Sequence, residues 1–159
     1  MEAQVLTITA LNAQNAFNKA NSEIKKTLQS LWPDHNFNRD ITEMVDSYEA
    51  ACELEGITQL TIADFEFLPE QDREYHFVDH QLNIIHRALN EGWTWKEGER
   101  GYYPVFNRAA GGSGFSLGLV GYCSSSSTVG ARRTYKDERL AMHSAKKFLH
   151  LHSVIQNNE

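Results

Sequence analysis

The chain has 159 residues, of which 41% are hydrophobic and 23% charged, as expected for one soluble globular domain spanning 1–159. No apolar run approaches the roughly 20 residues of a membrane-spanning helix, and the first four residues lack the basic start of a secretory signal. Cys52 and Cys123 are too few for a disulfide scaffold, so we expect reduced thiols, a cytoplasmic compartment and no membrane partner.

Charge is distributed unevenly around the net value of −6. Residues 1–92 carry 16 acidic and 6 basic side chains, whereas residues 93–159 carry 5 acidic and 9 basic ones. The net charge is therefore −10 in the acidic N-terminal region and +4 in the basic C-terminal region. Such a split indicates either a surface that steers a charged partner or two faces that keep one domain solvated, and both interpretations stay open.

The first predicted helix covers 9–32. Thr9 is a suitable N-cap, and Pro33 prevents the helix from continuing. Apolar residues recur every three or four positions and so share one helical face, namely Ala13, Phe17, Ala20, Ile24, Leu28 and Leu31. A short β-prone run at 5–8 precedes this helix, either as an edge strand or as its lead-in.

Two further helices are predicted in the acidic region. Asp40, with a glutamate three residues later, has the form of a capping box in front of a helix that Gly56 would end. After an irregular connector at 57–68, a third helix is expected to begin at Pro69 and to stop before Gly92. The acidic first turn of this third helix complements the helix dipole.

From Trp93 onward the pattern changes to short strands and glycine-rich turns. We expect three antiparallel strands at 102–107, 115–122 and 128–134, followed by one helix that begins near Asp137. Eight of the ten glycines lie in this region, which indicates turns, bulges or the close approach of another backbone. The predicted fold is α+β: N-terminal helices, a three-stranded antiparallel meander, and a C-terminal helix packed on the sheet.

Seven histidines and two cysteines raise the question of a metal or catalytic site. His76 and His80 are one helical turn apart, but the first is not followed by the glutamate of the helical zinc signature, so we expect both to face solvent. His150 and His152 point in different directions on a helix and do not form a chelating pair. No base lies near Cys123 in the sequence, which predicts a packed thiol at a strand end. The sequence therefore predicts no metal, no cofactor and no catalytic residue.

Cations and aromatic side chains occur together in the C-terminal region. Lysine and arginine bind phosphate groups, and bases stack on aromatic rings, so we predict a binding site for nucleic acid or a nucleotide. Its candidate residues are Trp93, Trp95, Tyr103, Arg132, Arg133 and Lys136. The alternative is structural, because aromatic residues of strands usually lie in a core and cations near a helix end complement its dipole.

Several short stretches follow one another in the second half of the chain: ALNEGW at 88–93, GYYPVF at 101–106, SGF at 113–115 and TVGAR at 128–132. Together with the first two helical segments, this succession resembles a family of small uncharacterised proteins encoded by bacteriophages and prophages of Bacteroides-type bacteria. The resemblance covers nearly the whole chain. In that family the aromatic stretch usually reads YYPWF, and Val105 stands in the tryptophan position here. The resemblance implies a phage context and transfers no catalytic residue.

The function predicted from the sequence is that of a phage-type accessory protein, a non-enzymatic binding module for nucleic acid or a nucleotide signal in the cytoplasm of the bacterial host. The alternative is a structural protein of the virion, or one that binds a host protein through its acidic helical region. A third hypothesis is an enzyme that uses Cys123 or a histidine-containing site. A homo-oligomer is compatible with each of these.

Overall fold

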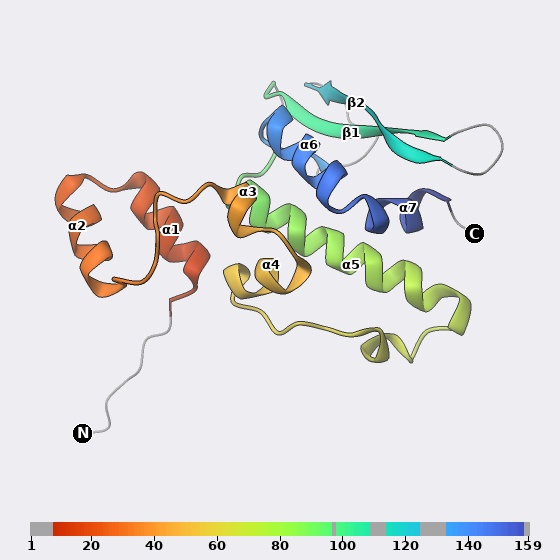
Figure 1. The fold of residues 1–159 in the computed structure, drawn as a ribbon, viewed down its shortest axis with the longest axis horizontal. Coiled ribbons are helices and arrows are strands. Elements are labelled where there is room, and N and C mark those ends of the chain that lie inside the picture. Colours follow the sequence, from red (N-terminus) through yellow and green to blue (C-terminus); the bar gives the residue numbers. More distant parts are fainter. Residues whose placement is uncertain (1–7, 97, 109–113, 125–132, 158–159) are drawn as a thin grey trace.

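The computed structural model describes residues 8–96, 98–108, 114–124 and 133–157. Within these ranges the chain is α+β, as predicted, with seven α-helices, one 3-10 helix and a two-stranded antiparallel sheet (Figure 1). None of the described helices is long and apolar enough to cross a membrane.

The first predicted helix is two helices. α1 (Ala10–Lys19) and α2 (Ser22–Leu31) are separated by two residues in extended conformation. The side chain of Asn21 accepts a hydrogen bond from the backbone N–H of Ile24 at 3.0 Å and so caps α2. The prediction of one helix over 9–32 was wrong, because an asparagine side chain competes for backbone groups inside a helix and favours a new N-cap.

The second predicted helix is also divided. α3 (Ile41–Met44) begins at Asp40, whose side chain caps its first turn, as predicted. After a break, α4 (Tyr48–Glu55) begins at Ser47, whose hydroxyl caps the new helix. Gly56 ends α4 with a φ of 65°, the left-handed conformation expected of a glycine in this position.

Helix α5 (Glu70–Asn90) is the centre of the fold. It follows the 3-10 turn η1 (Ile62–Phe65) and stops before Gly92, as predicted. Its 21 residues correspond to about 30 Å of helix. One face of α5 carries much of the hydrophobic core, with Val78, Leu82, Ile84, Ile85, Ala88 and Leu89 all buried.

Two of the three predicted strands form an antiparallel hairpin, β1 (Gly101–Arg108) and β2 (Phe115–Cys123). The predicted third strand at 128–134 lies largely outside the described residues. Its described continuation makes a single bridge, in which Tyr135 pairs with Tyr102 of β1. Within the described residues the sheet therefore has two strands, where the prediction had three.

The chain ends in two helices rather than the single one predicted. α6 (Glu138–Lys147) begins at Asp137, whose side chain is the N-cap, as expected. The helix then breaks at Phe148, and α7 (Leu149–Asn157) continues in a different direction. Phe148 is buried at this break, which anchors the junction of the two helices in the core.

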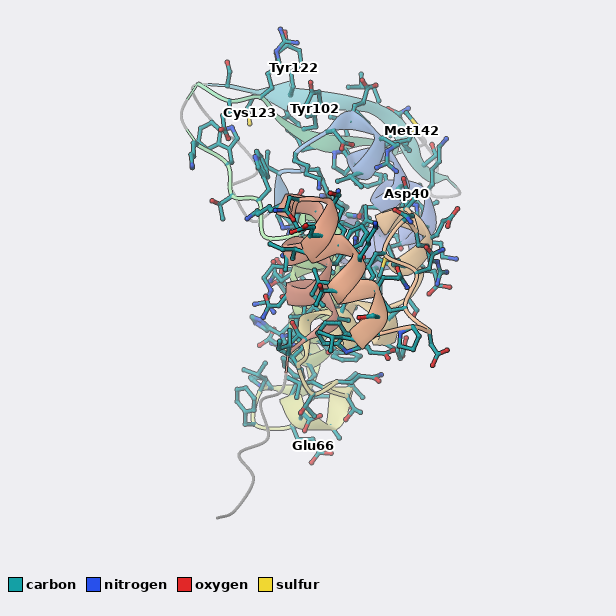
Figure 2. All side chains as sticks on the ribbon, turned by 90° about the vertical axis from the view of Figure 1, so that its left-hand side faces the viewer. Asp40, Glu66, Tyr102, Tyr122, Cys123 and Met142 are labelled. Atoms are coloured by element: carbon teal, nitrogen blue, oxygen red, sulfur yellow. The ribbon has the colours of Figure 1, made fainter. Side chains whose placement is uncertain are left out.

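The elements are stacked along the molecule. Figure 1 shows α6 and α7 lying between the hairpin and α5, and α4 packs on the other side of α5. α1 and α2 project to one side, where α1 contacts α4. Figure 2 shows the hairpin, marked by Tyr122 and Cys123, at one end of the molecule and the loop that contains Glu66 at the opposite end.

Candidate functional site

A short segment, residues 133–136, is held between the hairpin and α5. On one side, Tyr135 and Tyr102 exchange backbone hydrogen bonds of 2.9 and 2.7 Å. On the other side, the side chain of Asn90 donates from Nδ2 to the carbonyl of Thr134 at 3.0 Å, and its Oδ1 accepts from the backbone N–H of Lys136 at 2.9 Å. Asn90 is 1% exposed. Its side-chain amide makes the hydrogen bonds that a neighbouring strand would otherwise make with this carbonyl and this N–H.

His86 supports the same segment from one helical turn earlier on α5. Its Nε2 donates to the carbonyl of Thr134, so two donors from α5 converge on one backbone oxygen. Burial lowers the pKa of His86 to about 4, with a smaller contribution from the positive charge of Arg133. The imidazole is therefore neutral near pH 7 and keeps the one proton that it donates.

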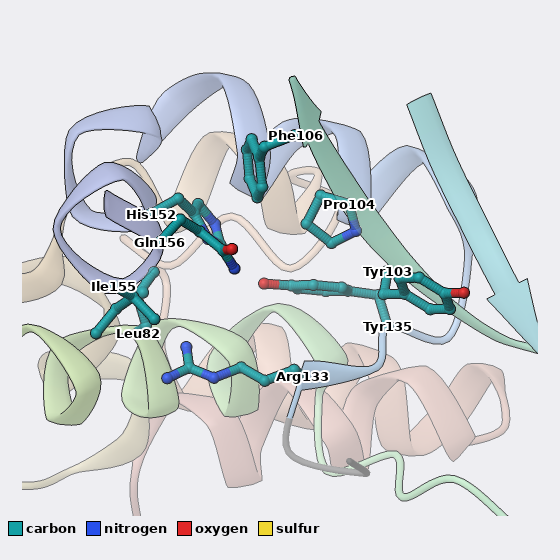
Figure 3. Close-up of a pocket in the computed structure, with 9 residues that line it drawn as sticks. All are labelled: Leu82, Tyr103, Pro104, Phe106, Arg133, Tyr135, His152, Ile155 and Gln156. Atoms are coloured by element: carbon teal, nitrogen blue, oxygen red, sulfur yellow. The ribbon is translucent and has the colours of Figure 1, made fainter. Parts of the chain in front are cut away.

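The segment forms one wall of a cavity beneath the hairpin, with a volume of about 260 Å³ (Figure 3). β1, α5 and α7 supply the other walls. The lining residues are Leu82, Tyr103, Pro104, Phe106, Arg133, Tyr135, His152, Ile155 and Gln156. Among these described residues, Arg133 alone carries a full charge. In Figure 3 the Tyr135 hydroxyl points towards the side of the cavity where Arg133, His152 and Gln156 lie.

The aromatic wall of the cavity depends on packing within the hairpin. Phe106 stacks on Phe115 of β2, with ring centroids 4.7 Å apart, and its ring centroid lies 4.9 Å from that of His152. Tyr103 lies across Gly121 of β2, where a Cβ atom would be 2.9 Å from the phenol ring. Glycine at this position therefore lets the Tyr103 ring lie close against the sheet.

A chain of hydrogen bonds fixes the polar side of the cavity. The Tyr135 hydroxyl donates to Ser144 Oγ at 2.7 Å, and Ser144 Oγ lies 3.1 Å from Nε2 of His152. Burial raises the pKa of Tyr135 and, aided by the charge of Arg133, lowers that of His152 to about 4, so both are neutral near pH 7. Ser144 is 0% exposed and does not line the cavity, so the chain orients its neighbours and presents no nucleophile to a ligand.

Arg133 supplies the positive charge of the cavity. Its Nη2 forms an ion pair with Asp79 of α5, whose other carboxylate oxygen accepts from Nδ2 of Asn83 at 2.9 Å. The Arg133 side chain is 23% exposed and that of Asp79 36%, so the pair lies near solvent at the cavity edge. No group in the described part of the chain bonds to Nε or Nη1 of Arg133, which leaves donors for a bound anion.

The two predicted cations that the structure describes do not form one patch. Arg133 pairs with Asp79, and Lys136 pairs with Glu91 at the end of α5. The two acidic residues are 12 positions apart, which on a helix corresponds to about 18 Å. Each cation is balanced by its own carboxylate. The third predicted cation, Arg132, lies outside the described residues.

Of the three aromatic residues predicted for the site, Tyr103 borders the cavity with its ring turned away from Arg133 (Figure 3), and the two tryptophans do not border it. The indole N–H of Trp95 donates to the backbone carbonyl of Glu99 at 3.0 Å. Trp93 is half-buried in the turn after α5. The structure therefore brings two of the six predicted residues, Tyr103 and Arg133, into one site.

Sequence reasoning assigned only Tyr103 and Arg133 of the nine lining residues to a site, and Tyr135 and His152 are among those it missed. One signal could have revealed His152. Ser144 belongs to the apolar stripe predicted for the last helix, and His152 follows it by eight positions, which on a regular helix is a rotation of about 80° and so still within the width of one apolar face. Two polar side chains on an apolar face indicate that they bond to each other or to a third buried group.

The metal and nucleophile candidates lie apart from the cavity. His76 is exposed, but the expectation for His80 was wrong: α4 covers that face of α5, and the His80 ring centroid lies 6.1 Å from that of Tyr48. Within the described ranges, no group of three or more His, Cys, Asp or Glu side chains could hold a metal ion. Cys123 is half-buried, with Sγ 3.6 Å from the carbonyl of Gly101.

Comparison with known proteins adds no functional assignment. No family model, no curated protein and no solved structure matches this chain. The chemistry of the cavity is therefore the starting point for a functional proposal.

Proposed function

We propose that the protein is a non-enzymatic binding protein whose cavity takes a small ligand with a planar ring and a negative group, such as a nucleoside monophosphate. One observation carries the proposal: Arg133 lines the same cavity as the aromatic rings of Phe106 and Tyr135. A guanidinium binds phosphate through two parallel hydrogen bonds, and aromatic rings stack on bases.

The size of the cavity supports a small ligand. Ligand pockets usually measure about 300–1,000 Å³, and this cavity, at about 260 Å³, lies just below that range. Such a volume suits a ligand no larger than a single nucleotide with one phosphate group. Nucleic-acid binding instead needs a series of available cations along a surface, whereas Arg133 is the one described cation that lines the cavity and Lys136 pairs with Glu91 elsewhere. We therefore favour a nucleotide over a nucleic acid.

Each polar lining residue has a role in this proposal. Asp79 holds the Arg133 side chain at the cavity edge, and the phosphate accepts hydrogen bonds from the remaining guanidinium donors. Tyr135 and Gln156 provide neutral hydrogen-bonding groups for the ring. His152 stays neutral near pH 7, so the charge of Arg133 is not joined by a second positive charge in the cavity.

Isothermal titration calorimetry with nucleoside monophosphates, the matching nucleosides and inorganic phosphate tests the proposal. We expect at least one monophosphate to bind. Its nucleoside should bind roughly tenfold or more weakly, because hydrogen bonds to charged groups contribute about 1.5–3 kcal/mol. The affinity should also fall between about 50 mM and about 300 mM salt, since screening weakens the contact of Arg133 with phosphate.

A matched pair of variants identifies the site. Arg133→Gln should lower the affinity roughly tenfold or more. Arg139→Gln is the control, because Arg139 also pairs with an aspartate, Asp40, but does not line the cavity. Equal affinities of the two variants, or no binding of any compound in the panel to the wild-type protein, would overturn the proposal.

The phage context implied by the sequence resemblance belongs to the proposal as well. A nucleotide-binding accessory protein acts in the cytoplasm of the infected cell, whereas a structural protein is incorporated into the virion. Mass spectrometry of purified phage particles separates the two. Recovery of the protein in a fixed ratio to the capsid would favour the structural alternative over nucleotide binding.

A further inference from the structure

A phenylalanine side chain is exposed at the end of the molecule opposite the hairpin. Phe67 is 79% exposed, and Ile62, five positions earlier, is 50% exposed. Both belong to the Phe67 loop, which we define as residues 61–70 and which lies between α4 and α5; Glu66 marks it in Figure 2. Apolar surface exposed in this way is typical of contact surfaces for other proteins.

Hydrogen bonds fix the backbone of the Phe67 loop. The guanidinium of Arg73 donates from Nε to the carbonyl of Leu68 at 2.9 Å and from Nη2 to the carbonyl of Glu66 at 3.0 Å, one on each side of Phe67. Asp64 closes the preceding turn by accepting a backbone hydrogen bond of 2.7 Å. The loop is therefore held in the conformation that exposes its phenylalanine.

A series of ring contacts connects Phe67 to the hydrophobic core. Its ring stacks on Phe65, with centroids 6.3 Å apart, and Phe65 lies 5.7 Å from Phe77 of α5. The ring of Phe77 lies 6.2 Å from Tyr48 of α4, a buried residue of the core. Because the exposed ring is connected to the core in this way, little conformational freedom remains to be lost when a partner binds.

Acidic residues are frequent in the sequence on both sides of the exposed phenylalanine. The acidic residues within 61–76 are Asp64, Glu66, Glu70, Asp72 and Glu74. The single cation in this range is Arg73, and its guanidinium is bonded to backbone carbonyls of the loop. The surface around Phe67 is therefore negative, which disfavours contact with nucleic acid or anionic lipid and favours a basic partner.

We propose that the Phe67 loop docks a protein partner whose surface combines an apolar pocket with lysine and arginine side chains around it. Phe67 fills the pocket, and the carboxylates of the loop face the cations at its rim. An aromatic anchor at the centre with polar groups around it is the usual arrangement of a binding hot spot. The opposite charges increase the association rate and exclude acidic partners.

A second copy of this chain is a poorer match for the loop. Three of the C-terminal cations are already paired within the molecule, namely Arg133 with Asp79, Lys136 with Glu91 and Arg139 with Asp40. The net charge of −6 also makes two copies repel each other. The occupant of the loop is therefore assigned as a different, basic protein.

The experiment places a photoreactive phenylalanine analogue at position 67 of the full chain and cross-links it in a bacterial lysate. The cross-linked protein is then purified, and its binding to the unlabelled chain is measured by biolayer interferometry. We expect Phe67→Ala to weaken this binding roughly tenfold or more. Glu66→Lys combined with Glu70→Lys should slow association severalfold at low salt and have a smaller effect at high salt.

Two control variants are matched to these changes. Leu119→Ala removes an apolar side chain that is 58% exposed on the hairpin, and Glu53→Lys reverses an exposed charge on α4. Neither should alter binding of the partner. Since Phe67 is largely exposed, Phe67→Ala should unfold within about 2 °C of the wild-type midpoint, so a loss of binding cannot be attributed to loss of the fold.

Three results would each overturn the proposal: no protein cross-links at position 67, the purified partner binds Phe67→Ala as tightly as the wild type, or the cross-linked species is a second copy of this chain. Arg133→Gln removes the cation of the cavity beneath the hairpin, which none of the residues of the Phe67 loop lines, and should leave docking unchanged. Ligand binding by Arg133→Gln therefore tests the cavity proposal, and partner binding by Phe67→Ala tests the docking proposal, so the failure of one can be distinguished from the failure of the other.

Discussion

The hairpin end of the molecule buries polar side chains, whereas the Phe67 loop at the opposite end exposes an apolar one. Beneath the hairpin, Asn90 and Ser144 are almost completely buried, and each is hydrogen-bonded. In the Phe67 loop an apolar ring is exposed, and acidic residues flank it in the sequence. A buried polar group is costly unless it is paired, and an exposed apolar group adds little to folding. Substitutions at the hairpin end should therefore affect stability, and those at the Phe67 loop should affect association.

The largest expected change in the free energy of unfolding comes from lowering the pH. His86 and His152 have folded-state pKa values of about 4, against 6.5 for an unperturbed histidine. Between these values the unfolded chain binds protons that the folded protein does not, so the free energy of unfolding falls as the pH falls. Each histidine should account for up to about 3 kcal/mol of that loss. Urea denaturation at about pH 7 and about pH 4.5 measures the change.

Variants assign the pH dependence to the buried histidines. His86→Gln and His152→Gln should each make the free energy of unfolding less dependent on pH, whereas His150→Gln, at an exposed position, should not. Asp40, whose pKa is about 2, titrates below this window. A free energy of unfolding that is the same at both pH values would contradict the neutral, buried state of His86 and His152.

Asn90→Ala should have the next largest effect, a loss of about 3 kcal/mol in the free energy of unfolding. The substitution removes two buried hydrogen bonds and leaves the backbone N–H of Lys136 without its acceptor. Asn83→Ala is the control, because the Asn83 side chain lies on the same helix and bonds to the partly exposed Asp79. Equal losses in the two variants would show that Asn90 does not hold the 133–136 segment in the way described.

Tyr135→Phe should cost about 1 kcal/mol, because it removes one buried hydrogen bond and keeps the ring. It also leaves Ser144 and His152 without the donor that orients them, so ligand binding to the cavity should weaken as well. Tyr75→Phe, at a position 39% exposed, is the control and should change neither quantity. Denaturation and calorimetry on the same preparations give both measurements, and an unchanged stability of Tyr135→Phe would contradict the prediction.

Arg73→Gln should have the smallest effect on stability, below about 1 kcal/mol, because its hydrogen bonds lie near solvent. Its main result should be faster amide hydrogen exchange in residues 61–70, with exchange in α5 beyond the first turns unchanged. Arg39→Gln is the control, since Arg39 also donates to a backbone carbonyl, that of Glu43. Unchanged exchange in the Phe67 loop would mean that Arg73 does not fix its conformation.

Local capping signals in the sequence predicted several helix ends correctly, whereas the internal breaks of three predicted helices were missed. Asp40 and Asp137 cap helices, and Gly56 ends one, because the groups that these residues satisfy belong to neighbours in the chain. The breaks at Asn21 and Ser47 were missed because the apolar stripe continues across both. A stripe indicates which face is buried and does not show whether one helix or two helices carry it.

The cavity could be predicted only partially. Arg133 and Tyr103 were selected by residue type, but the carboxylate that pairs with Arg133 lies 54 positions away in the sequence. Pairing of this kind is decided by tertiary packing, which the net charge of a segment does not reveal. The net charge of +4 in the C-terminal region therefore overstated the cations available to a ligand, since Lys136 and Arg139 lie outside the cavity and are paired with Glu91 and Asp40.

The bonds from α5 to Thr134 have a consequence for synthesis. His86 and Asn90 have their partner 48 and 44 positions later in the chain, so α5 leaves the ribosome before that partner is made. Until then both polar side chains face a surface that the 133–136 segment has not yet covered. A product that terminates before this segment lacks these bonds and the cavity wall, and should be degraded by cellular proteases as an incompletely folded chain. The cell would thus accumulate the complete protein and remove its prematurely terminated forms.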